Sequence, residues 1–144
     1  MYEHFPHEAD IGIRGIGKTI EESFCEAAKA LFNVEVKIKK VHAEKKVKIR
    51  ADASNLSELL VEWLNALLAK ASIHEMVFSK FKVKIEEKKG KQKLMGEAFG
   101  ERLDVEKHSA KEEVKGATYS QLKVEKATKG KHKGKWIAQC IVDV

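Results

Sequence analysis

The sequence predicts an α+β fold in a single domain of residues 1–144, with a mostly antiparallel β-sheet and two amphipathic helices. Two patterns support this prediction. Two segments repeat apolar residues every three to four positions, which is the spacing of one helix face. Several other segments alternate apolar and polar residues, which is typical of strands with one buried and one wet face. A chain of 144 residues is long enough to bury a normal hydrophobic core.

The first half of the chain predicts one helix between short strands. Residues 11–14 alternate as a strand. Thr19 and Glu22 form a Thr-x-x-Glu capping box, which opens a helix over about residues 19–33. Alternation continues after this helix and predicts two further strands, over residues 34–41 and 45–51.

The second half predicts a longer helix and the main part of the sheet. Asn55 and Glu58 form another capping box, and a broad apolar face follows it. The polar residues 104–115 are expected to be irregular. Four more strands are expected, over residues 77–86, 93–103, 117–126 and 136–142.

The composition favours a globular cytoplasmic protein. Apolar residues make up 43% of the chain and charged residues 35%, which excludes a disordered polymer. No apolar run approaches the ~18 residues of a membrane span. Cys25 and Cys140 are expected to be reduced packing residues, and His108 a surface residue. The net charge of +6 fits attraction to RNA, and a solvated lysine surface explains it equally well.

Gly12 to Thr19 match the phosphate-binding pattern Gly-x-x-x-x-Gly-Lys-Thr letter for letter. The context argues against nucleotide hydrolysis, because a P-loop follows a buried strand of a parallel sheet. Parallel strands also need crossover helices, and this chain predicts hairpins instead. We therefore interpret residues 12–19 as a strand, a turn and a helix cap, with a P-loop-type nucleotide-binding protein as the alternative.

Two acidic residues near the two ends of the chain are candidate metal ligands. Asp10 begins a strand, and Asp143 lies beside the carboxylate of Val144. If the last strand pairs with the first, these oxygens converge, and hard oxygen ligands suit Ca²⁺ or Mg²⁺ better than Zn²⁺. Spacing alone also allows both acids to be ordinary strand-end residues. His7 is a further candidate, as a ligand or as a general base, but no nucleophile lies at a recognisable spacing, so no catalytic residue is identified.

The order and spacing of several blocks resemble the archease family over nearly the whole chain. These blocks lie at residues 7–11, 17–24, 27–32, 59–68, 96–97, 114–119 and 136–144. The resemblance implies a non-catalytic protein that activates the RtcB-type ligase in tRNA splicing. Such proteins promote guanylylation and multiple turnover of the ligase and broaden its nucleotide use, so tRNA would be met only through the ligase.

The same resemblance implies specific site residues. It carries a divalent metal site onto Asp10, Asp143 and the terminal carboxylate of Val144, with Ca²⁺ as the first expectation and Mg²⁺ or Mn²⁺ as alternatives. It assigns a role in activity to Lys115, and His7 is added to this group as a candidate for partner contact. Glu8 departs from the family, which usually has Thr there.

A basic RNA-binding or chaperone-like module remains a third functional hypothesis, because the strands and the loop at residues 129–135 are rich in lysine.

Overall fold

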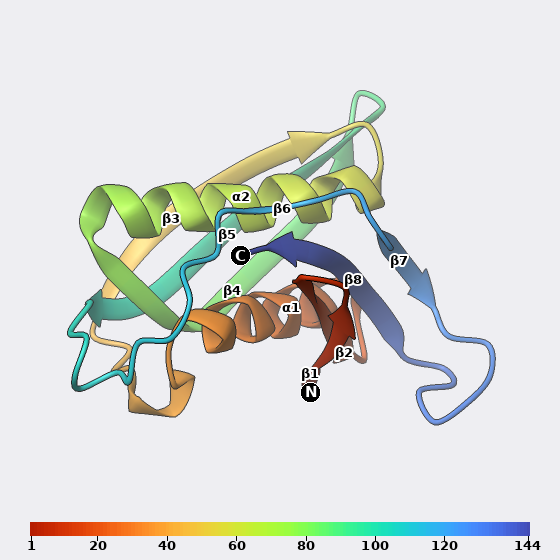
Figure 1. Ribbon diagram of the computed structural model, residues 1–144. Coiled ribbons are helices and arrows are strands. Elements are labelled where there is room, and N and C mark those ends of the chain that lie inside the picture. Colours follow the sequence, from red (N-terminus) through yellow and green to blue (C-terminus); the bar gives the residue numbers. More distant parts are fainter.

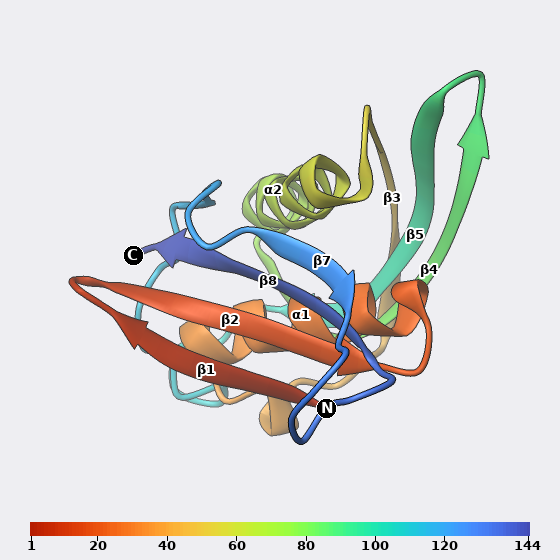
Figure 2. The same cartoon turned by 90° about the vertical axis from the view of Figure 1, so that its right-hand side faces the viewer.

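In the computed structural model, which describes residues 1–144, two helices lie between two β-sheets (Figure 1, Figure 2). This confirms the predicted α+β class with mostly antiparallel strands. The elements are, in chain order, β1 (Tyr2–His7), β2 (Asp10–Gly17), α1 (Ile20–Glu35), a short 3₁₀ helix η1 (Ile38–Lys40), β3 (Lys45–Ala53), α2 (Leu56–His74), β4 (Met76–Lys88), β5 (Lys91–Arg102), β6 (Gly116–Ala117), β7 (Lys123–Lys126) and β8 (Trp136–Asp143).

The five-stranded sheet joins the two ends of the chain. Its order is β1-β2-β8-β6, with β7 also paired to β8, and every pair is antiparallel. The three-stranded sheet has the order β3-β5-β4 and is also antiparallel. The last strand therefore pairs with β2 near the start of the chain, as the metal-site hypothesis requires.

Both predicted capping boxes open their helices as expected. The Thr19 side chain accepts a hydrogen bond from the Glu22 N–H at 3.0 Å, and the Asn55 side chain accepts one from the Glu58 N–H at 2.9 Å. Helix α1 lies very close to the five-stranded sheet at Gly15. A Cβ atom on Gly15 would lie 2.2 Å from the Ser23 carbonyl oxygen, so only glycine fits there.

The core is continuous between the two sheets. The Trp63 indole N–H of α2 donates to the Phe24 carbonyl of α1 at 3.1 Å, which ties the helices together. Phe32 of α1 packs against the rings of Phe78 and Phe81, with ring centroids 5.4 and 5.9 Å apart. The core therefore fixes α1 against both sheets.

Three predictions of local structure were wrong. Residues 34–41 are not a strand, because α1 continues to Glu35 and the Asn33 side chain then accepts from the Ile38 N–H, which closes a turn into η1. The strand β1 was missed. The strand predicted at residues 117–126 is divided into β6 and β7, because the chain leaves the sheet between them.

The P-loop alternative fails on the structure. β2 remains extended through Gly17, and both of its neighbouring strands run antiparallel to it. Thr19 caps α1 instead of facing a phosphate. None of the helices is both long enough and apolar enough to cross a membrane.

Candidate functional site

One end of the five-stranded sheet brings together residues from both ends of the chain. Ile11 lies opposite Val142 in the last pair of this register, and Asp10 and Asp143 are the next residues along β2 and β8. Asp10 also pairs with His7 of β1. Opposite residues of antiparallel strands have side chains on the same face, so these three side chains share one face of the sheet. We call His7, Asp10, Asp143, Val144 and Lys115 the acidic edge.

The two aspartates of the acidic edge have no internal partner. Neither the Asp10 nor the Asp143 carboxylate takes part in a hydrogen bond or an ion pair within the chain. Asp143 is exposed and Asp10 is partly buried. Carboxylates that are held in place by strand pairing and left without a counter-charge provide hard oxygen ligands for a divalent cation.

His7 contributes a different feature. Its Nδ1 atom is buried and has no hydrogen-bond partner. The ligand atoms of His7, Asp10 and Asp143 do not all lie within 4.8 Å of one another, whereas those of His42, Glu44 and Glu101 do. The sheet therefore aligns the predicted ligands without closing them into a compact three-residue cluster.

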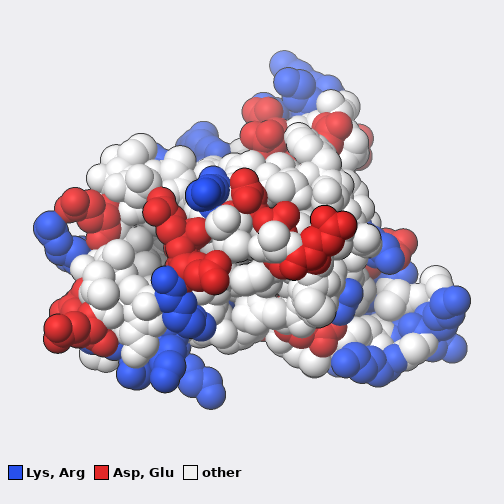
Figure 3. All heavy atoms as spheres, viewed as in Figure 1, with Lys and Arg blue, Asp and Glu red and all other residues white.

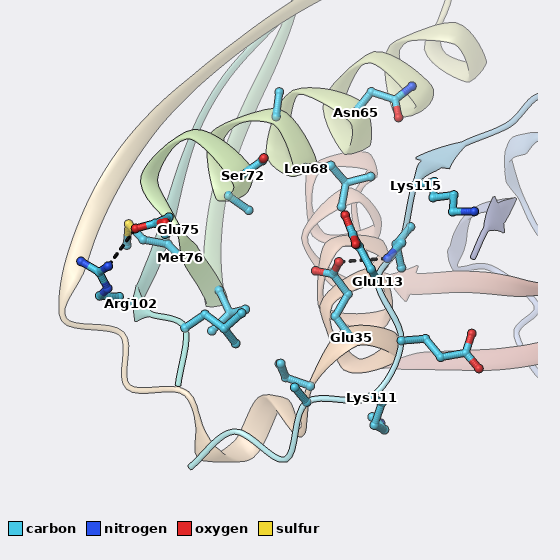
Figure 4. Close-up of a pocket in the computed structure, with 18 residues that line it drawn as sticks. Glu35, Asn65, Leu68, Ser72, Glu75, Met76, Arg102, Lys111, Glu113 and Lys115 are labelled. Atoms are coloured by element: carbon cyan, nitrogen blue, oxygen red, sulfur yellow. Dashed lines mark hydrogen bonds and ion pairs between the residues drawn. The ribbon is translucent and has the colours of Figure 1, made fainter. Parts of the chain in front are cut away.

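Lys115 lies next to Asp143 through the backbone. The Lys115 N–H donates to the Asp143 carbonyl at 2.7 Å, immediately before Gly116 pairs with Asp143 in β6. The Lys115 side chain is exposed, and Lys115 is one of the residues that line the adjacent hollow (Figure 4). The structure thus places the backbone of Lys115 beside that of Asp143, a contact that sequence spacing alone did not predict.

The segment before Lys115 is held by the last residue of α1. The Glu35 carbonyl accepts from the Lys111 N–H at 2.7 Å, and the Glu35 carboxylate accepts from the Val114 N–H at 3.0 Å. Burial raises the pKa of Glu35, the Val114 hydrogen bond opposes this effect, and the charge of Glu113 adds to it. Sequence analysis missed Glu35, because an acid at the end of an apolar helix stripe carries no distinctive signal.

Two hollows lie on either side of residues 110–115. The larger, of about 940 Å³, lies between α2, the end of α1 and this segment (Figure 4). The smaller, of about 480 Å³, includes Asp10. Lys111 and Glu112 line both of them. In Figure 3, acidic side chains gather over the middle of the face that carries the C-terminus, and basic side chains lie mostly around its rim.

His108 is completely buried, so the expectation of a surface residue was wrong. Its Nδ1 accepts from the Asp104 N–H at 3.0 Å, and its Nε2 therefore donates to Glu101 at 3.0 Å. Glu101 also accepts from the His42 N–H and from Lys107. Its pKa is lowered to about 2, chiefly by the His42 hydrogen bond and then by Lys107. Internal donors thus already occupy Glu101, the central residue of the His42–Glu44–Glu101 cluster.

Both cysteines pack as predicted. Cys140 is fully buried on β8, and Cys25 is partly buried on α1. Burial raises the pKa of Cys25 to about 11 and that of Cys140 to about 12, so neither is a thiolate at neutral pH. Neither cysteine has the properties of a catalytic nucleophile.

Comparison with known proteins decides the family. The model of the Archease protein family matches residues 2–144. The chain belongs to the archease family. It is 45% identical to the archease of Pyrococcus furiosus over 144 residues, covering 100% of this chain and 99% of that protein. The archease of Thermococcus kodakarensis is 41% identical over 143 residues, covering 99% of this chain and 98% of that protein.

Two solved structures share the archease fold. The solution structure of protein 1598 from Methanobacterium thermoautotrophicum has a TM-score of 0.84 at 33% identity, covering 99% of this chain and 98% of that one. The crystal structure of an archease from Thermotoga maritima, described as a possible chaperone, has a TM-score of 0.52 at 15% identity, covering 100% of this chain and 98% of that one. The second likeness concerns the fold alone.

Proposed function

We propose that this archease is a non-catalytic protein that activates an RtcB-type ligase in tRNA splicing, and that its acidic edge is the part that acts on the ligase. The observation that carries this proposal is the position of Asp10 and Asp143 at the adjoining ends of β2 and β8, with both carboxylates free of internal partners. An accessory role also fits the absence of a nucleophile paired with a base at this edge.

The acidic edge suits a divalent cation. The carboxylates of Asp10 and Asp143 and the terminal carboxylate of Val144 would hold it, with Ca²⁺ as the first candidate and Mg²⁺ or Mn²⁺ as alternatives. A bound cation would supply positive charge that organises nearby phosphate or carboxylate oxygens. His7 lies opposite Asp10 on β1, and the Lys115 backbone contacts that of Asp143, so both residues are candidates for contact with the partner.

The proposed step is guanylylation of the ligase. The acidic edge approaches the ligase active site and orders the groups that transfer GMP to the active-site histidine. Lys115 is exposed, and in this proposal its ammonium group would neutralise phosphate. The tRNA substrate is reached through the ligase. Two unpaired cysteines fit a reducing compartment, and we place this function in the cytoplasm.

The test is a mixing assay with purified RtcB-type ligase and GTP, in which covalent guanylylation of the ligase is measured. The parent protein is expected to accelerate guanylylation, and Asp10→Ala and Asp143→Ala are expected to reduce that stimulation at least about tenfold. Asp52→Ala is the matched control, because Asp52 is also an exposed strand aspartate but lies on β3. Undiminished stimulation by both edge variants would refute the proposal.

A further inference from the structure

The outer face of the three-stranded sheet is covered by no other element. In Figure 2 both helices lie on one side of β3, β5 and β4, and nothing lies on the other side. The side chains of these strands that point inward to the core include those of Ile49, Phe81 and Leu94. The outward positions alternate with them and are exposed or partly exposed.

The outward positions form three consecutive rows across the sheet, and each row has a cation at both flanks. Register pairs the flanking strands through the central strand β5. The rows are Lys46–Phe99–Lys80, Lys48–Glu97–Lys82 and Arg50–Met95–Lys84. We call these nine residues the basic face.

The charge of the basic face is strongly one-sided. All six flanking cations are exposed, and Glu97 is the single acid among the nine residues. Lys46 pairs with Glu97 at 3.2 Å, and the other five cations have no ion-pair partner within the chain. The next row, Asp52–Lys93–Glu86, carries acids at both flanks and ends the basic face.

The geometry of these cations is periodic. Outward side chains repeat at roughly 7 Å along a strand, and β3 and β4 lie roughly 10 Å apart on either side of β5. The cations of β3 and those of β4 thus form two lines, one along each flanking strand, and their even spacing matches a ligand with regularly repeated negative charges. Phe99 and the exposed Met95 lie on β5, between these two lines of cations. The ammonium groups of Lys80 and Lys82 lie 5.3 and 5.5 Å from the centroid of the Phe99 ring. An aromatic ring between cations provides a contact for nucleobases.

We infer that the basic face binds the sugar-phosphate backbone of single-stranded RNA. The repeated cations favour a regular polyanion, and the central aromatic ring favours RNA over an acidic polypeptide. This inference goes beyond the proposed function, because it concerns a different sheet and needs no ligase. The acidic edge lies at the C-terminus at the front of Figure 1, and the three-stranded sheet lies behind the helices.

The test measures binding of a fluorescein-labelled oligouridylate to the full-length protein by fluorescence anisotropy at several salt concentrations. The double variant Lys48→Gln/Lys84→Gln removes one cation from each flank. We expect it to weaken binding about tenfold at low salt and to reduce the slope of log affinity against log salt by about 1.4, or about 0.7 for each lost phosphate contact.

The matched control is Lys129→Gln/Lys133→Gln, which makes the same change in net charge in the loop before β8. Both control lysines are exposed and have no ion-pair partner. An equal loss of affinity in the control would overturn the inference, because net charge alone would then explain binding. Unchanged affinity in Lys48→Gln/Lys84→Gln would also overturn it. All four changes are at exposed positions, so thermal unfolding is expected to show intact folds.

Two further measurements distinguish RNA binding from binding of another ligand, and distinguish this inference from the proposed function. Competition by poly-L-glutamate that equals unlabelled RNA, charge for charge, would identify an acidic polypeptide as the ligand and contradict the RNA assignment. Guanylylation of the ligase is measured without RNA in parallel. If Lys48→Gln/Lys84→Gln loses RNA binding but still stimulates guanylylation of the ligase, the inference is supported. If this variant loses both, the basic face is a ligase-docking surface and the RNA assignment is overturned. Failure of the unmodified protein to stimulate guanylylation would overturn the proposed function and leave the RNA result standing.

Discussion

The acidic edge and the basic face differ in how the sequence builds them. The basic face comes from a hairpin and one added strand, and each of its strands shows the alternation of exposed and buried residues in its own sequence. The acidic edge takes residues from three distant segments: near residue 10, at residue 115 and at the end of the chain. A surface of the first kind depends on local periodicity, and a site of the second kind depends on long-range topology.

This difference predicts that the acidic edge is sensitive to substitutions far from it. The five-stranded sheet is positioned by α1, and residues 110–115 are held by the end of the same helix. The basic face has no comparable external support on its outer side. Four substitutions, taken from the largest expected effect to the smallest, test how the acidic edge is held.

The largest effect is expected for Gly15→Ala. The added Cβ would lie 2.2 Å from the Ser23 carbonyl and 2.3 Å from the Ala27 nitrogen, so α1 must move away from the five-stranded sheet. We expect a loss of about 3 kcal/mol in the free energy of unfolding, measured by urea denaturation. Gly116→Ala is the control, because its Cβ would meet nothing closer than Asn65 at 3.6 Å. A similar loss of unfolding free energy in both variants would show that the close contact between Gly15 and α1 does not cause the destabilisation.

Glu101→Gln is expected to have the next largest effect. It weakens the bonds from His42, Lys107 and the buried His108 that anchor the start of the segment leading to Lys115. We expect a loss of about 1–2 kcal/mol near neutral pH by chemical denaturation. Glu44→Gln, at an exposed acid of the same cluster, is the control and is expected to change little.

The pH dependence of this effect has a definite sign. The pKa of Glu101 is lowered from 4.5 to about 2 in the folded protein, so its ionised form stabilises the fold above pH 4.5. That contribution is lost as the pH falls from about 4.5 to about 2. The stability difference between the parent and Glu101→Gln should shrink over this window, and a difference independent of pH would contradict the assignment.

Glu35→Gln is expected to raise stability at neutral pH, whereas Glu101→Gln lowers it. The pKa of Glu35 is raised by burial, so ionisation of this carboxyl destabilises the fold as the pH rises above 4.5. The glutamine oxygen still accepts from the Val114 N–H and removes the repulsion from Glu113. The variant should be slightly more stable than the parent at pH 7 and equal to it below pH 4.5. Glu112→Gln, at an exposed position in the same segment, should show no such pH-dependent gain.

The smallest effect is expected at the turn before Asp10. Glu8 has a φ of 52°, a left-handed conformation that favours glycine. Glu8→Gly should therefore raise the melting temperature slightly, corresponding to about 0.5 kcal/mol. Ala9→Gly, at a position without positive φ, should lower stability by a similar amount, and a loss in both variants would show that the turn is not strained.

The fold class could be predicted because it depends on local signals. The capping boxes at Thr19 and Asn55 and the alternation in β4 each identify an element without knowledge of its neighbours. Residues 34–41 misled the prediction because buried residues alternate there, whereas the Asn33 side chain closes a turn that no periodicity records. The end of α1 therefore required the structure.

The site could be predicted only in part. Asp10 and Asp143 were candidate ligands by residue type, but their proximity depends on β8 lying next to β2. The roles of Glu35 and His108 arise from contacts with segments far away in the sequence. No spacing within the chain signals such contacts, since their partners are set by the packing of whole elements.

The most direct test of the central claim is calcium binding to the acidic edge, measured by isothermal titration calorimetry. The parent protein is expected to bind one Ca²⁺ per chain, and Asp10→Asn/Asp143→Asn is expected to weaken binding at least about a hundredfold, or about 2.7 kcal/mol. Asp52→Asn on β3 should bind like the parent. Equal affinity of the parent and the double variant for Ca²⁺, Mg²⁺ and Mn²⁺ would contradict the assignment of the acidic edge as a cation site.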